Sequence, residues 1–152
     1  MKKEQGAPTP GYREALQAIG RYFDQQFYRG VFVAEVDDGY VGKARPGEED
    51  AEMHAEGFTF PHADVQALIV STAGQTGTVD GPDHCPFGYG VFMAAVGEMC
   101  DRTGARLVSI LEVTQGFILS FTTASADGKG VERRRHLLDR AGVEELVAQA
   151  GV

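Results

Sequence analysis

The sharpest cluster of chemically useful residues in the sequence is the run Asp83-His84-Cys85-Pro86. Cys85 lies just before a predicted helix, where the positive end of the helix dipole lowers a thiol pKa and favours the nucleophilic thiolate. His84 is a base beside it, although adjacent side chains usually point apart, and no clear third partner is present. We therefore expect a plain loop cysteine, and Cys85 with His84 is the catalytic candidate if the protein is an enzyme.

Two glutamates form the second candidate, because Glu35 and Glu112 occupy equivalent positions in two similar stretches of the chain. Brought together, two carboxylates can act as a general acid–base pair in which one pKa is raised. The competing expectation is structural: Arg29 faces Glu112 across two paired strands, and Arg106 faces Glu35. The two arrangements exclude each other on geometry.

The only basic cluster consists of Arg133, Arg134 and Arg135. These side chains could bind a phosphate, a carboxylate or an acidic patch on a partner protein, and they are our candidate ligand-binding or partner-binding residues. The alternative is that they form salt bridges within the chain, because the corresponding stretch of the first half is acidic. That acidic stretch contains Glu49, Asp50, Glu52 and Glu56.

No motif predicts a metal ion or a cofactor. His54, His62, His84 and Cys85 do not follow the spacings of zinc ligands, so no metal site is expected unless the fold brings them together. Glycine-rich phosphate-binding loops and the nucleophile elbow of hydrolases are missing from the sequence as well.

The size, composition and charge of the chain exclude several classes of protein. A chain of 152 residues with 43% hydrophobic and 24% charged residues can form one good core. The formal net charge of −8 argues against a general binder of nucleic acid or anionic membranes, and no apolar run could span a bilayer. Residues 1–9 are polar and predict a flexible lead-in without a signal peptide. With only Cys85 and Cys100, no disulfide framework is expected, and the cytoplasm is the default location.

The candidate residues are placed by a repeat with an offset of 77 residues. Residues 11–44 and 88–121 match without gaps at ten of 34 positions, which indicates an internal duplication. The identical pairs are Gly11/Gly88, Tyr12/Tyr89, Ala18/Ala95, Gly20/Gly97, Asp24/Asp101, Arg29/Arg106, Val31/Val108, Glu35/Glu112, Val36/Val113 and Gly39/Gly116.

Each half is predicted to run helix, hairpin, strand, helix. The first helix is expected to begin at Thr9-Pro10 and to end near Phe27, whose side chain continues an apolar stripe. Gly20 and Gly97 lie within the two equivalent helices, where glycine is costly, so they predict a close approach of each helix to the sheet or to the other helix.

We therefore expect one α+β domain in which two repeats share an antiparallel or mixed sheet about a pseudo-two-fold axis, with the helices packed on that sheet. Repeat 1 covers residues 10–75, a linker covers 76–86, and repeat 2 covers 87–152. The first strands of the two repeats are expected to pair antiparallel, with Val33 opposite Val108 and Val31 opposite Ile110.

The function expected from these features is a non-catalytic module that binds a protein partner or a small ligand at the groove between the repeats. One alternative is a small enzyme that uses Cys85 or a Glu35/Glu112 pair near the axis. Another is a regulatory subunit that self-associates through a sheet edge, so a homo-oligomer is possible.

Overall fold

The computed structural model describes residues 9–46, 55–75 and 81–151 of the chain. All six strands belong to one antiparallel sheet in the order β3-β2-β1-β4-β5-β6. The elements are α1 (Tyr12–Gln25), β1 (Tyr28–Val36), β2 (Gly39–Pro46), β3 (Glu56–Pro61), α2 (His62–Thr72), α3 (Tyr89–Thr103), β4 (Arg106–Val113), β5 (Gly116–Ala124), β6 (Val131–Asp139) and α4 (Arg140–Ala150). The predicted α+β class is confirmed, and the sheet is antiparallel rather than mixed.

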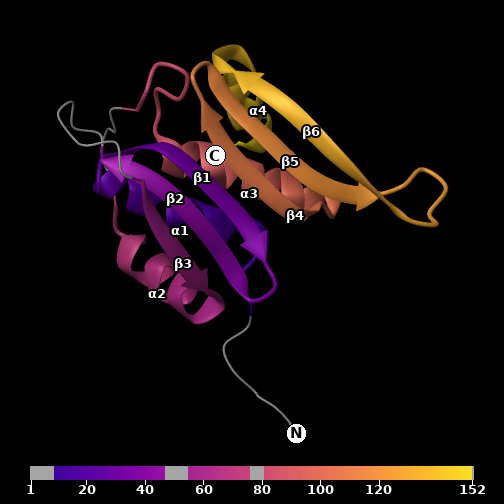
Figure 1. Cartoon of the computed structure of the whole chain (residues 1–152), viewed down its shortest axis with the longest axis horizontal. Helices are drawn as coiled ribbons and strands as arrows, with labels where there is room; N and C mark the ends of the chain where they lie inside the picture. Colours follow the sequence, from indigo (N-terminus) through magenta and orange to yellow (C-terminus); the bar gives the residue numbers. More distant parts are fainter. Residues whose placement is uncertain (1–8, 47–54, 76–80, 152) are drawn as a thin grey trace, which may run out of the picture.

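The helices cover one face of the sheet and leave the other face open. Figure 1 looks onto the open face, with α1 and α3 behind the strands. α1 packs against α3, while α2 lies against α1 and α4 lies against α3. The core between these two layers is apolar, and its largest fully buried side chains include Tyr89, Phe23, Phe92, Phe117 and Leu16.

The order helix, hairpin, strand, helix occurs twice along the chain, as the sequence predicted. The first set of elements forms the β3-β2-β1 half of the sheet, and the second set forms the β4-β5-β6 half. The two halves meet where β1 pairs with β4 and where α1 packs on α3. Residues far apart in the sequence are therefore brought together at this junction.

Gly20 and Gly97 lie at the crossing of α1 and α3. A Cβ atom at Gly20 would lie 2.6 Å from the backbone oxygen of Tyr89, and one at Gly97 would lie 2.5 Å from the backbone nitrogen of Arg13. Real Cβ atoms do not approach backbone atoms this closely. The prediction that these glycines mark a close helix approach is confirmed, and the partner of each helix is the other helix.

The central strands pair antiparallel as predicted, but the predicted register is wrong. Val33 lies opposite Ile110 rather than opposite Val108. Both strands carry an irregularity, at Arg29/Phe32 in β1 and at Arg106/Ser109 in β4, so only three residue pairs form the ladder. The predicted pairings of Arg29 with Glu112 and of Arg106 with Glu35 are consequently absent from the ladder.

The first helix ends near Phe27 as predicted, but it begins at Tyr12, with Gly11 as its N-cap and no side-chain cap, rather than at Thr9-Pro10. Phe27 does not continue the buried stripe of α1, because it follows the helix with a φ of 58° and its side chain is 71% exposed. The residue 77 positions later is Gly104, which ends α3 with a φ of 76°. Both helices therefore end in the left-handed conformation, which glycine adopts readily and which costs a residue such as phenylalanine about 1 kcal/mol or more.

Candidate functional site

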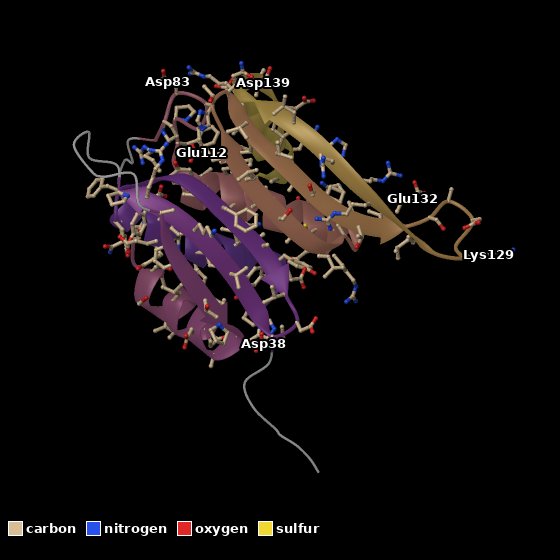
Figure 2. All side chains as sticks on the ribbon, in the orientation of Figure 1. Asp38, Asp83, Glu112, Lys129, Glu132 and Asp139 are labelled. Carbon is tan, nitrogen blue, oxygen red and sulfur yellow. The ribbon has the colours of Figure 1, made fainter. Side chains whose placement is uncertain are left out.

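Glu112 is held by three donors at one end of the β1–β4 junction. Its Oε1 atom accepts hydrogen bonds from the Tyr89 hydroxyl at 2.8 Å and from the backbone N–H of Val31 at 3.0 Å. Its Oε2 atom lies 2.5 Å from Nε2 of His84, and the two side chains are only 6% and 14% exposed. Figure 2 shows Glu112 close to the loop that carries Asp83. Both oxygens are satisfied, so this carboxylate ties β1, α3 and the loop before α3 together.

Glu35 makes the equivalent contacts at the other end of the junction, with one difference. Its Oε1 atom accepts from the Tyr12 hydroxyl at 2.8 Å and from the backbone N–H of Val108 at 3.3 Å. Within the described ranges, no side chain takes the place that His84 has beside Glu112, and the Oε2 atom of Glu35 has no hydrogen bond. Glu35 instead lines a cavity of about 330 Å³.

The two glutamates are not brought together as an acid–base pair. Glu35 bonds to Val108, whereas Glu112 lies four residues further along the same strand, which corresponds to roughly 13 Å of extended chain. In Figure 2, Glu112 and Asp38, which belongs to the turn just after the strand of Glu35, are far apart on the molecule. Each glutamate instead supports the end of the other half's strand, which is a structural role.

Two aspartates that the sequence analysis did not single out as functional residues join the halves further. Asp24 accepts hydrogen bonds from the backbone N–H groups of Tyr89 and Gly90, both at 2.9 Å, at the start of α3. Asp101 does the same for α1, bonding the first two amides of that helix at 3.1 Å. Burial raises the pKa of Asp24, and the two amide bonds oppose that rise. Both aspartates belong to the ten identical pairs of the repeat, and this repetition is the feature of the sequence that could have singled them out.

Cys85 does not have the surroundings of a nucleophile. Its side chain is fully buried, and Sγ donates to the backbone oxygen of Gly88 at 3.1 Å. Burial, together with the negative charges of Asp24 and Glu112, raises the pKa of the thiol above its usual range. His84 bonds to Glu112, so it does not serve as a base for this thiol. The geometry supports a packing role for Cys85 before α3.

This arrangement predicts that Cys85 is protected from alkylation. In the folded protein at neutral pH, iodoacetamide should label Cys85 far more slowly than it labels the urea-unfolded chain, because the buried thiol is protonated. A Val70→Cys variant supplies an exposed control thiol, since Val70 is 72% exposed on α2. Peptide mass spectrometry over time measures both rates. Labelling of Cys85 as fast as that of the control would contradict the prediction.

The arginines of β6 do not contact the acidic stretch of the first half in the way the sequence suggested. Glu56 lies on β3, at the opposite edge of the sheet, and bonds to the hydroxyl of Tyr28. Glu49, Asp50 and Glu52 lie outside the described residues. Arg133 instead reaches across the sheet and donates to the backbone oxygen of Leu107 at 2.6 Å. The salt-bridge prediction is therefore wrong for Glu56, because five strand-to-strand steps separate it from the arginines.

The open face of the sheet carries an apolar row. Side chains alternate between the two faces of a strand, so the neighbours of buried Val33 and Ile110 point away from the helices. Across four strands, these outward residues lie directly opposite one another. The row consists of Phe32, Leu111, Ile118 and Leu137. Three of the six large apolar residues exposed in the described part of the chain belong to this face, namely Leu111, Val131 and Leu137.

Cations flank this apolar row on both sides. By the same alternation, Lys43 and Arg45 of β2 and Arg133 and Arg135 of β6 belong to the open face. The strand residues whose side chains point to the open face include a single carboxylate, Asp139 at the end of β6, and all residues of the six strands are described. The side chain of Asp139 caps α4 through Gly142. In a chain of net charge −8, this face is therefore distinctly basic.

The histidines that the structure describes do not converge on a metal site. His62 lines the cavity beside Glu35, whereas His84 lines a separate cavity of about 610 Å³ with Glu112, and His54 lies outside the described ranges. The described residues contain no group of three or more His, Cys, Asp or Glu side chains placed to hold a metal ion. Within the same residues, every helix is too short or too polar to cross a membrane.

Comparisons of this chain with protein-family models, with curated proteins and with solved structures found no match. The open face and the cavities beside Glu35 and Glu112 are therefore the features of the molecule that bear on its function.

Proposed function

We propose that the protein is a non-catalytic module that binds a protein partner on the open face of its sheet, over the junction of β1 and β4. The apolar row between two groups of cations carries this proposal. Leu111 and Leu137 are 41% and 62% exposed there, and an exposed apolar patch with a polar rim is typical of a protein interface. The partner is an amphipathic segment with acidic side chains on either side of an apolar centre, because that charge pattern complements the face.

A second copy of the chain fits this face less well. Two open faces brought together would place the four cations of one copy against those of the other. The β6 edge has the same difficulty in the register centred on Arg134, because antiparallel pairing of two β6 strands would then bring Arg133, Arg134 and Arg135 against arginines of the partner strand. Self-association is therefore the weaker alternative.

We also propose that the chain is an internal duplication with a pseudo-two-fold axis at the junction. Reciprocal contacts support it: Tyr12 and Val108 hold Glu35 as Tyr89 and Val31 hold Glu112. The cross-helix caps made by Asp24 and Asp101 are reciprocal in the same way. The partner-binding face then lies where the two repeats meet. Cys85 and Cys100 are both free thiols, which fits a reducing compartment such as the cytoplasm.

The proposed partner class can be tested with two model peptides of equal length and identical apolar positions. One peptide carries glutamate at every polar position, and the other carries lysine. In ¹⁵N–¹H NMR titrations, we expect the acidic peptide to shift the amides of Leu111, Ile118 and Leu137, and the binding to weaken as salt is added. The lysine peptide should produce no such shifts.

Two variants complete this test. Arg135→Glu should weaken binding of the acidic peptide by about tenfold, because it replaces an attraction by a repulsion of similar size. Val70→Glu places the same acidic side chain at an exposed site on α2, with a net-charge change of −1 against −2 for Arg135→Glu, and should leave binding unchanged. Equal binding of both peptides, or shifts confined to the helices, would refute the proposed interface.

A further inference from the structure

The cavity beside Glu35 lies between the starts of α1 and α2, the end of α3, the end of β1 and the starts of β2 and β4. Its volume of about 330 Å³ falls within the lower range of small-molecule sites in proteins. The residues that line it include Tyr12, Glu35, His62, Asp101 and Arg106. The residues that would recognise a ligand thus come from both halves of the chain.

Two residues that line this cavity carry a polar atom with no partner among the described residues. One is Nδ1 of His62, which is buried without a hydrogen bond. The other is Oε2 of Glu35, whose Oε1 atom takes both of the hydrogen bonds that the side chain makes. Burial and the nearby carboxylate of Glu35 raise the pKa of Tyr12, which keeps its hydroxyl protonated as the donor to Oε1. The remaining oxygen of Glu35 is therefore available to a ligand.

The equivalent carboxylate at the other end of the junction shows which chemistry fits this oxygen. Glu112 has the same tyrosine and backbone donors on Oε1, and its Oε2 atom is bonded by the imidazole ring of His84. An ionised carboxylate only accepts hydrogen bonds, so the His84 ring donates its Nε2–H. At Glu35 the chain supplies no such ring from its described residues, and a cavity lies in its place.

We propose that this cavity binds a small nitrogen-donor ligand of the imidazole class, which donates an N–H to Glu35 as His84 does to Glu112. The side chain of His62 lines the cavity and would pack beside the ligand. The charges of the lining favour a donor that is neutral or positive, since Glu35 and Asp101 outweigh the single cation Arg106. The class is defined by its N–H donor and by a size of one small ring with short substituents.

Imidazole itself is the probe for this proposal. In an NMR titration of the full chain at neutral pH, imidazole should produce saturable shifts of the amides near Glu35, His62 and Val108. Acetate, which offers no N–H donor, should produce none. Glu35→Gln keeps the side-chain shape but removes the charge, and it should weaken imidazole binding by about tenfold or more, because hydrogen bonds to charged groups are the strong ones.

A second variant makes the test independent of the folding of Glu35→Gln. His84→Ala removes the ring beside Glu112 and should create a matching second site there. Imidazole should then shift the amide of Val31 as well and should raise the melting temperature of this variant more than that of the wild type. The proposal is overturned if imidazole gives no saturable shifts near Glu35 in the wild type. It is equally overturned if both Glu35→Gln and His62→Ala bind imidazole as tightly as the wild type.

Discussion

Gly97→Ala is expected to lower the free energy of unfolding by about 3 kcal/mol or more, which is the upper part of the range for overpacked cores. The added methyl group would lie 2.5 Å from the backbone nitrogen of Arg13, and backbone atoms cannot move aside as the end of a side chain can. α1 and α3 would have to separate, which would also lengthen the hydrogen bonds of Asp24 and Asp101 across the junction. Gly20→Ala should behave similarly, because its methyl group would meet the backbone of Tyr89.

Gly142→Ala is the matched control, since Gly142 also lies within a helix. The nearest atom to its added methyl group is the side-chain Cδ2 of Leu138 at 3.3 Å, which can adjust. The higher helix propensity of alanine should then offset the contact, so the stability should stay the same or rise by up to about 1 kcal/mol. Urea unfolding followed by circular dichroism measures all three variants. A Gly97→Ala protein as stable as the Gly142→Ala protein would disprove the close helix crossing.

Asp24→Ala is expected to lower the free energy of unfolding by about 2–3 kcal/mol. Asp24 is only 8% exposed, so its loss would leave the amides of Tyr89 and Gly90 buried without an acceptor. Asp101→Ala removes the equivalent cap at an exposed position, where water can replace the carboxylate, and should cost only about 1 kcal/mol. Equal losses for the two variants in urea unfolding would show that burial does not set the strength of these caps.

Titration of Asp24 should also contribute to the pH dependence of the free energy of unfolding. Its native pKa is raised by burial, so the folded protein binds a proton at a pH where the unfolded chain, with a pKa of about 3.9, has lost it. Within that window the folded state carries more protons, and its stability therefore falls as the pH rises. The Asn side chain of an Asp24→Asn variant does not titrate. The wild type should therefore gain stability relative to this variant as the pH is lowered to about 4. A pH-independent difference would contradict the raised pKa.

The predictions for Gly97 and Asp24 bear on function because both residues lie at the junction of the two halves. The apolar row of the open face crosses this junction between Phe32 and Leu111, and Glu35 lines its cavity at one end of it. Asp24 and Gly97 contact neither site directly, and they position the two halves that form both. Variants at these positions should therefore weaken partner binding only to the extent that they unfold the protein.

The sequence alone determined the order of the helices and strands and the antiparallel pairing of the two central strands. It also indicated that the glycines within the two long helices mark a close approach to another element. These features follow from local rules: apolar periodicity distinguishes helix from strand, and a glycine within a helix is costly unless something approaches it closely. Gly20 and Gly97 occurred at matching positions, which indicated one shared cause, and the crossing of α1 and α3 is that cause.

Only the tertiary structure decided the register of β1 on β4. A shift of two residues keeps every side chain on the same face of the sheet, so the alternation of apolar residues is satisfied equally by Val108 or Ile110 opposite Val33. The irregularities at Arg29/Phe32 and Arg106/Ser109 shorten the ladder and go with the register in which Val33 lies opposite Ile110. The glutamate of each half then accepts a hydrogen bond from a strand amide that the ladder does not use.

The roles of the charged residues were likewise decided in three dimensions. Asp24 reaches the first amides of a helix 65 residues later in the chain, and the β6 arginines lie at the opposite edge of the sheet from Glu56. The identity of a residue shows which bonds it can make. Its partner depends on which strands and helices become neighbours, because hydrogen bonds and ion pairs act over a few ångströms whatever the distance along the chain.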